Sequence, residues 1–340
     1  MDSLKLVDAG LRAFDARLPE VSPARCLVTR YRASACRRCL DVCSTGAIAP
    51  EGWLTVDPDR CTSCGACAAV CRTGALSFDG RSLVLREYLH TAGQQHQRHA
   101  RIICHRSGSP GPLADYCAGE VKVRCLGGIS AADLIGAAAN GMKRLELQSG
   151  LCETCLDRAA GMAVEAAIRT AEHVLGTLGV EIAFERSRKE SPPGEGSAPE
   201  NNPAGQTDGV SRRELFSFLA RGLQRTVGNS TTAPRRGVAE LHAQTPPPHA
   251  HERLVRDLVD LAGEMCKWPV ALSTGLPLGR ITIGDLCNGC GLCVKYCPHG
   301  CFRPEADSIV VEDNRCTGCG LCAEVCPPEA LIVKPGELVQ

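Results

Sequence analysis

Residues 287–298 read CNGCGLCVKYCP, and residues 316–327 read CTGCGLCAEVCP. Both runs place two, two and three residues between their four cysteines, and both end in Cys-Pro. In this pattern the first three thiolates of a run bind one 4Fe-4S cluster, and the fourth reaches the cluster of the other run. The two runs therefore predict a C-terminal module with two clusters.

The crossed pattern divides the eight thiols into two ligand sets. The first set is Cys287, Cys290, Cys293 and Cys326; the second is Cys316, Cys319, Cys322 and Cys297. The glycines between the cysteines suit a loop that needs positive φ angles. A pair of zinc sites is the alternative, but structural zinc sites use two separated cysteine pairs, so the repeated spacing favours clusters.

A similar pattern lies near the N-terminus. Cys61, Cys64, Cys67 and Cys71 repeat the full spacing, and an incomplete run of cysteines at 36, 39 and 43 precedes them. The crossed pattern predicts a third cluster bound by Cys61, Cys64, Cys67 and Cys43.

A fourth cluster would take Cys36, Cys39 and Cys71, but Ala33 occupies the position of its first ligand. Cys26, ten residues before Cys36, is the candidate fourth ligand. The alternatives are a three-iron cluster, a non-cysteine fourth ligand, or no cluster at all, in which case Cys26 would be a buried thiol. The arginines around these cysteines would raise cluster potentials, form a docking face, or be solvated.

Residues 100–186 have a different periodicity. Strands are predicted at 101–104, 121–125, 143–148 and 180–185, and helices at 130–141 and 153–179, the first capped by Ser130. Alternating strands and helices predict a small parallel sheet.

Four cysteines lie at the strand ends of this predicted sheet: Cys104 ends the first strand, Cys125 ends the second, Cys152 follows the third and Cys155 begins the helix after it. Because ligands of α/β folds bind at the carboxyl ends of the strands, we expect these thiols to meet there and to hold a 2Fe-2S cluster. The alternatives are a dithiol pair of Cys152 and Cys155 at a helix N-terminus, or four inert buried thiols.

The predicted fold class is α/β and α+β multidomain. The domains are an N-terminal cluster module (1–85), an α/β domain (86–186), a flexible linker rich in Pro, Gly, Ser and Asn (187–210), a helical connector (211–265) and the C-terminal cluster module (266–340).

Composition limits the protein class. The chain has 340 residues, 23 cysteines and zero net charge, and no run of about 20 apolar residues. We therefore expect no membrane span, no nucleic-acid partner and a cytoplasmic location, where thiols stay reduced and clustered cysteines bind metal or do redox chemistry.

Two resemblances extend these expectations. The flanking cysteine modules resemble two-cluster bacterial ferredoxins, and residues 101–108 and 123–155 resemble the delta subunit of methyl-viologen-reducing hydrogenase, an iron-sulfur protein that links a hydrogenase to heterodisulfide reductase. The second resemblance implies that the four middle cysteines are cluster ligands. It also implies partners among hydrogenase-, formate dehydrogenase- or heterodisulfide reductase-like subunits.

The sequence contains no Gly-rich dinucleotide or P-loop signature and no nucleophile-base constellation of standard spacing, so no catalytic residue is predicted. The leading hypothesis is a non-catalytic electron-transfer subunit of an oxidoreductase. The alternatives are a reductase acting through the middle dithiol or an incompletely ligated cluster, and an iron-sulfur sensor or assembly factor.

Overall fold

The computed structural model describes residues 18–50, 53–78, 81–95, 97–107, 120–188, 249–262, 270–271, 276–305, 308–335 and 337–338. Residues 211–248 and 263–265 of the expected helical connector lie outside these ranges. So does the expected linker, except Ser187 and Arg188, which end a strand.

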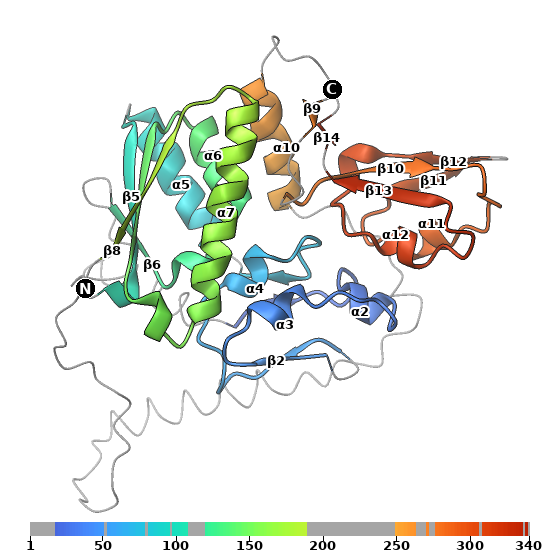
Figure 1. Ribbon diagram of the computed structural model, residues 1–340, viewed down its shortest axis with the longest axis horizontal. Coiled ribbons are helices and arrows are strands. Elements are labelled where there is room, and N and C mark those ends of the chain that lie inside the picture. The colour runs from blue at the N-terminus through green and yellow to red at the C-terminus, as the bar shows by residue number, and fades with distance from the viewer. Residues whose placement is uncertain are drawn as a thin grey trace, which may run out of the picture. The chain divides into compact units, whose positions relative to one another are not determined.

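Short helices and strands joined by turns build the N-terminal cysteine module (Figure 1). Two small antiparallel pairs hold it: β1 with β4, and β2 with β3. Its elements are β1 (Glu20–Val21), α2 (Leu27–Arg30), α3 (Arg38–Val42), β2 (Ile48–Ala49), β3 (Thr55–Val56), α4 (Ala66–Ala69) and β4 (Leu76–Ser77).

A four-stranded sheet forms the middle of the chain, in the order β6-β5-β7-β8, and all its strands are parallel. The strands are β5 (His99–Cys104), β6 (Glu120–Val123), β7 (Arg144–Ser149) and β8 (Ala183–Arg188). The predicted parallel sheet is confirmed. The last strand begins three residues later than predicted and runs beyond residue 186 into the expected linker.

Helices α6 (Ala131–Ala139) and α7 (Arg158–Thr177) connect the strands and pack against one side of the sheet (Figure 1). Ser130 caps α6 as predicted: its hydroxyl accepts from the Asp133 N–H, while the Asp133 carboxylate accepts from the Ser130 N–H. Gly141, at φ +83°, follows the helix end. A capping box and a left-handed glycine fix both ends of α6.

Two further helices join the same core, although the predicted domain bounds place them partly or wholly outside the α/β domain. Helix α5 (Arg81–Gln94) contributes Leu85 and Leu89, although its first residues were placed in the N-terminal module. Helix α10 (His249–Ala262), from the expected connector, packs on α6 through Leu254 and Leu258. The core of the α/β domain therefore draws on segments more than 150 residues apart.

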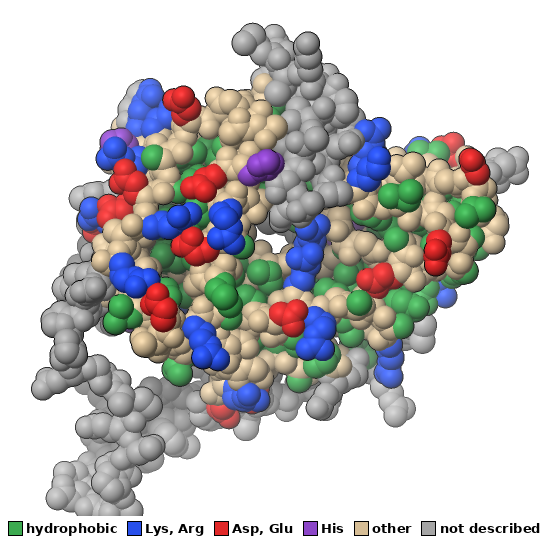
Figure 2. Space-filling model, viewed as in Figure 1, with side chains coloured by type: hydrophobic (Ala, Val, Ile, Leu, Met, Phe, Trp, Pro, Cys, Tyr) green, Lys and Arg blue, Asp and Glu red, His purple; other side chains and the backbone are tan. Residues whose placement is uncertain are grey.

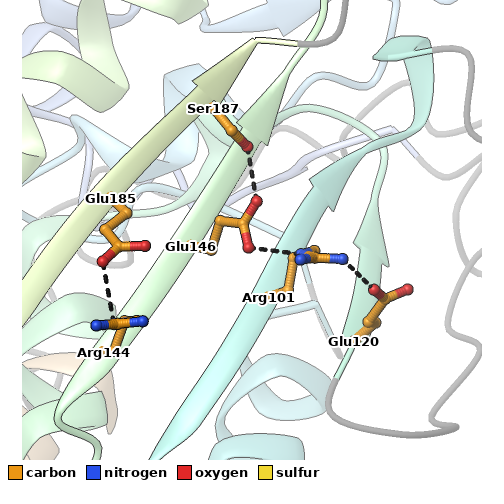
Figure 3. Close-up of polar contacts among 6 residues, drawn as sticks. All are labelled: Arg101, Glu120, Arg144, Glu146, Glu185 and Ser187. Carbon is orange, nitrogen blue, oxygen red and sulfur yellow. Dashed lines mark hydrogen bonds and ion pairs between the residues drawn. The ribbon is translucent and has the colours of Figure 1, made fainter.

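The other side of the sheet carries a ladder of charged side chains (Figure 3). Arg101 donates to Glu146 (2.7 Å) and to Glu120 (2.6 Å), so it links strands β7, β5 and β6. Arg144 pairs with Glu185 at 3.0 Å. Basic and acidic side chains are interspersed on the face that Figure 2 shows, as expected for a chain with zero net charge.

The C-terminal cysteine module is built on antiparallel pairs. Strand β10 (Gly279–Ile283) pairs with β13 (Leu331–Pro335), and β11 (Phe302–Glu305) pairs with β12 (Ser308–Val311). A third pair joins β9 (Val270–Ala271) to β14 (Glu337–Leu338). The helices are α11 (Leu292–Tyr296) and α12 (Leu321–Glu324). No helix among the described residues is long and apolar enough to cross a membrane.

Candidate cluster-binding sites

The second predicted C-terminal set comes together in the core of its module. Burial, and then the nearby charges of Cys319, Cys316 and Cys297, raise the pKa of the Cys322 thiol. Burial raises the pKa of Cys319 to about 12, and the charges of Cys297 and Cys316 add to this. Four thiols from two cysteine runs therefore converge on one place.

Three thiols of the first predicted C-terminal set also lie together. Burial and the charges of Cys290 and Cys287 raise the pKa of Cys293 to about 11, although the Val294 N–H opposes them. Cys287 and Cys290 are exposed. Cys326, the expected fourth member, packs against the same core as Cys293.

One buried cysteine of this module was not assigned any role by the sequence reasoning. Cys301 is 3% exposed and lies within hydrogen-bonding reach of Cys297 and Cys316. Hydrogen bonding to these two thiols raises its pKa, and the same bond from Cys301 lowers the pKa of Cys297. The spacing Cys297-x3-Cys301, directly after a complete run, was the available signal.

In the N-terminal module, Cys43 joins the run that begins at Cys61, as the crossed pattern predicts. Burial raises the pKa of Cys67, and the charges of Cys64, Cys61, Cys39 and Cys43 raise it further. One hollow is lined by Cys43 and by the first three cysteines of the run.

The incomplete N-terminal set includes Cys26 in the structure. Burial raises the pKa of Cys39 to about 12, followed by the charges of Cys71, Cys26 and Cys36. These four thiols line one cavity of about 390 Å³. Cys26 is buried at the N-terminus of α2, whereas Ala33 is exposed. The chain thus supplies a fourth thiol from upstream.

The four middle cysteines also meet. Hydrogen bonding with Cys104 and burial raise the pKa of Cys125. Burial raises the pKa of Cys152, and the charges of Cys104 and Cys155 contribute. The group lies at the carboxyl end of β5, where it was expected.

The details of that prediction need two corrections. Cys125 lies two residues beyond the end of β6, where it accepts from the Gly127 N–H at 3.4 Å. Cys155 does not begin a helix, because a single 3₁₀ turn occupies Cys152–Thr154 and α7 starts only at Arg158. The predicted helix N-terminus at this dithiol is therefore wrong.

The middle cysteines adjoin the N-terminal module. The charge of Cys64 is near enough to raise the pKa of Cys125, after burial and the bond with Cys104. The Arg124 Nε donates to the Thr62 carbonyl at 2.7 Å, and the Ala159 N–H donates to the Ser44 hydroxyl at 3.0 Å. These bonds fix the α/β domain against the loop that begins with Cys61 and against the segment that follows Cys43.

The two cysteine modules also pack on each other. Leu27 of α2 lies in one apolar cluster with Leu321 and Val325 of the C-terminal module, and the rings of Tyr31 and Tyr296 meet edge to face at 5.7 Å. Cys319 lines the same cavity as the set that contains Cys26. Thiols of the two modules therefore face one another across this interface.

Left-handed glycines shape the cysteine loops as predicted. Gly289 and Gly318 have φ angles of +70° and +62°, and the glycines after the second cysteines, Gly291 and Gly320, are similar. In the N-terminal module Ser63 takes the equivalent position at φ +55°. Amides inside these loops point towards sulfur: the Gly318 N–H donates to the Cys316 sulfur at 3.4 Å.

Each of the five groups brings several thiols together, and thiolates are the ligands that bind iron-sulfur clusters. Among the described residues, no group of three or more His, Cys, Asp and Glu side chains has the geometry for a single metal ion.

Comparisons with known families agree with the two flanking modules. The family model of a 4Fe-4S binding domain matches residues 54–77, and that of a 4Fe-4S dicluster domain matches residues 286–330. Neither curated proteins nor solved structures give a match. The chain contains ferredoxin-type 4Fe-4S domains, and these support an iron-sulfur electron-transfer role.

Proposed function

We propose that this chain is an electron relay with four 4Fe-4S clusters in its two cysteine modules and a 2Fe-2S cluster in its α/β domain. Such clusters supply one-electron redox chemistry. The four cubane ligand sets are Cys61, Cys64, Cys67 and Cys43; Cys26, Cys36, Cys39 and Cys71; Cys316, Cys319, Cys322 and Cys297; and Cys287, Cys290, Cys293 and Cys326. The middle set is Cys104, Cys125, Cys152 and Cys155.

The observation that carries the proposal is that the middle set, the two N-terminal sets and the buried C-terminal set follow one another in space. The charge of Cys64 is near enough to raise the pKa of Cys125 in the middle set, and the charge of Cys39 is near enough to raise the pKa of Cys67. Across the module interface, Cys319 shares a cavity with the Cys26 set. Residues of one set thus lie beside residues of the next, which is the arrangement that stepwise transfer needs.

Cys26 bears on the choice between a relay and a reductase. An incompletely ligated cluster would leave iron open to a substrate, but here a fourth buried thiol accompanies Cys36, Cys39 and Cys71. In the middle set, Cys152 has Cys104 as well as Cys155 beside it, which favours a four-thiolate site over a dithiol pair.

Partner proteins would supply and remove the electrons. The exposed Cys287 and Cys290 put the first C-terminal set at the surface, so this is one end at which a partner could approach. The resemblance of the middle domain to the hydrogenase delta subunit rests on the sequence alone. It favours partner subunits of the hydrogenase, formate dehydrogenase or heterodisulfide reductase type, in an oxidoreductase complex.

The test is a count of iron and acid-labile sulfide, with EPR spectra recorded through a reductive titration of the anaerobically purified chain. We expect about sixteen irons in cubane clusters and about two more in a 2Fe-2S centre. The 2Fe-2S signal should disappear in Cys152→Ser. About eight irons, confined to the C-terminal module, would refute a relay that spans the chain.

A further inference from the structure

We propose that Arg30 and Arg72 of the N-terminal module raise the reduction potential of the cluster held by Cys297, Cys316, Cys319 and Cys322 in the C-terminal module. This inference rests on the proposed relay. It makes the two arginines positioning residues for a site on the far side of the module interface.

Arg30 reaches out of its own module. Its side chain is only 4% exposed, and its Nε donates to the Tyr296 carbonyl at 2.8 Å. One terminal nitrogen donates to the carbonyls of Lys295 (3.0 Å) and Cys297 (3.3 Å). The other terminal nitrogen donates to the Ala24 carbonyl of the N-terminal module at 2.8 Å.

The acceptors on the C-terminal side belong to the end of α11, where carbonyls have no partner within the helix. A guanidinium suits them because it presents several donors in a fixed fork. These bonds anchor the guanidinium beside Cys297.

Arg72 reaches the same cysteine set from another direction. Its Nη1 donates to the Gly318 carbonyl at 3.1 Å, inside the loop between Cys316 and Cys319. Burial lowers the pKa of Arg72, whereas the charges of Cys319 and Cys316 raise it. Burial likewise lowers the pKa of Arg30, while Cys297 and Cys319 oppose that effect. Both arginines therefore interact electrostatically with thiols of this one set.

A cluster gains negative charge when it is reduced, so a nearby fixed positive charge favours the reduced form. The effect is large where water is excluded and small where salt and solvent screen it. Cys316 and Cys322 are buried, whereas Cys287 and Cys290 of the neighbouring set are exposed. The arginines should therefore shift the buried cluster much more than the exposed one.

The experiment is an EPR-monitored redox titration of the full-length, cluster-loaded chain. Cys319→Ser and Cys290→Ser assign the two C-terminal signals by removing one each. The test variants are Arg30→Met and Arg72→Gln, each with its lysine counterpart. Arg303→Gln is the matched control, because Arg303 is a 60% exposed arginine of the same C-terminal module, paired with Glu305 at 3.3 Å.

We expect each neutral variant to lower the reduced-to-oxidised ratio of the Cys319-dependent signal about tenfold at a fixed potential, which is about 59 mV for one electron. The Cys290-dependent signal and the Arg303→Gln variant should stay near wild type. Lysine should restore the potential because it keeps the charge, even where it cannot restore the fork of hydrogen bonds.

Full iron content with an unmoved Cys319-dependent midpoint in both neutral variants would overturn the inference and leave the relay intact. Equal shifts of both C-terminal signals would overturn it too, because they would mark a general loss of packing. Absence of the Cys319-dependent signal from the wild-type chain would instead remove the proposed relay, and the inference with it. Arg72→Gln keeps the test independent of Arg30, whose replacement also uncaps α11.

Discussion

Two glycines at equivalent positions of the C-terminal runs provide a matched test of the packing around the Cys316 loop, which includes Arg72 of the N-terminal module. Gly289 and Gly318 both follow the first cysteine of a run by two residues, and both have left-handed φ angles. A Cβ on Gly289 would meet nothing within 4 Å. On Gly318 it would lie 2.5 Å from the Leu278 carbonyl oxygen and 3.1 Å from Nη1 of Arg72.

Alanine at Gly289 should cost only the left-handed backbone term, about 1–2 kcal/mol. Alanine at Gly318 adds the contact with a fixed backbone oxygen, and overpacking of this kind costs about 1–3 kcal/mol more. The smaller entropy of the unfolded alanine chain affects both variants alike and cancels in the comparison. We therefore expect Gly318→Ala to be less stable than Gly289→Ala by about 1–3 kcal/mol.

The assay is anaerobic urea unfolding of both variants, followed by far-UV circular dichroism and by the visible absorbance of the clusters. Bound clusters break simple two-state behaviour, so the comparison uses the difference between the two midpoints and not an absolute free energy. Gly318→Ala should also move the Cys319-dependent EPR signal, since its Cβ displaces Arg72. Identical midpoints would refute the predicted contact of the Gly318 position with the Leu278 carbonyl, and identical EPR spectra would refute its predicted contact with Arg72.

Three other predictions follow from single contacts. Cys26→Ser should lose about one iron of four at its site and produce a three-iron EPR signal, whereas Cys301→Ser, outside every proposed ligand set, should keep full iron content by chemical analysis. Burial raises the pKa of Glu146, but hydrogen bonds from Arg101 and Ser187 outweigh burial and lower this pKa. Ionised Glu146 therefore stabilises the folded protein above the unfolded pKa of 4.5, and this contribution is lost as the pH falls through the lower folded pKa. Arg101 is 42% exposed, so Glu146→Gln should cost under about 1 kcal/mol at neutral pH, with wild-type and variant unfolding midpoints converging in acid. Ser130→Ala removes the cap of α6 and should lower the unfolding free energy by about 1 kcal/mol, measured with urea.

The sequence predicted those features that depend on local spacing. The 2-2-3 cysteine pattern indicated which thiols of distant runs would meet, and the structure brings Cys43 to the Cys61 run and Cys297 to the Cys316 run. Alternating strands and helices predicted the parallel sheet, and Ser130 marked the start of α6. Each of these signals involves a few residues with one dominant physical reason.

Other features depend on which helix packs against which part of the core, and local sequence patterns do not predict these packing partners. Helix α5 has little amphipathic character, so nothing in residues 81–94 indicated that Leu85 and Leu89 belong to the α/β core. Helix α10 is strongly amphipathic, but its pattern does not name α6 as its partner. Cys155 was expected at a helix start because residues 153–179 have an almost continuous helical composition, yet Cys152–Thr154 forms a separate turn.

The interface between the cysteine modules is the clearest example of packing that local sequence patterns do not predict. It also changes the interpretation of the arginines near the N-terminal cysteines. Arginines around the incomplete N-terminal set were expected to raise the potentials of their own clusters, to form a docking face, or to be solvated. Arg30 instead is buried against the carbonyls that end α11, and Arg72 binds inside the Cys316 loop. Backbone carbonyls are present at every helix end, so no sequence motif marks them as an arginine site. An arginine in one cysteine module should therefore be assigned to a cluster by the backbone it binds, and not by the nearest cysteine in sequence.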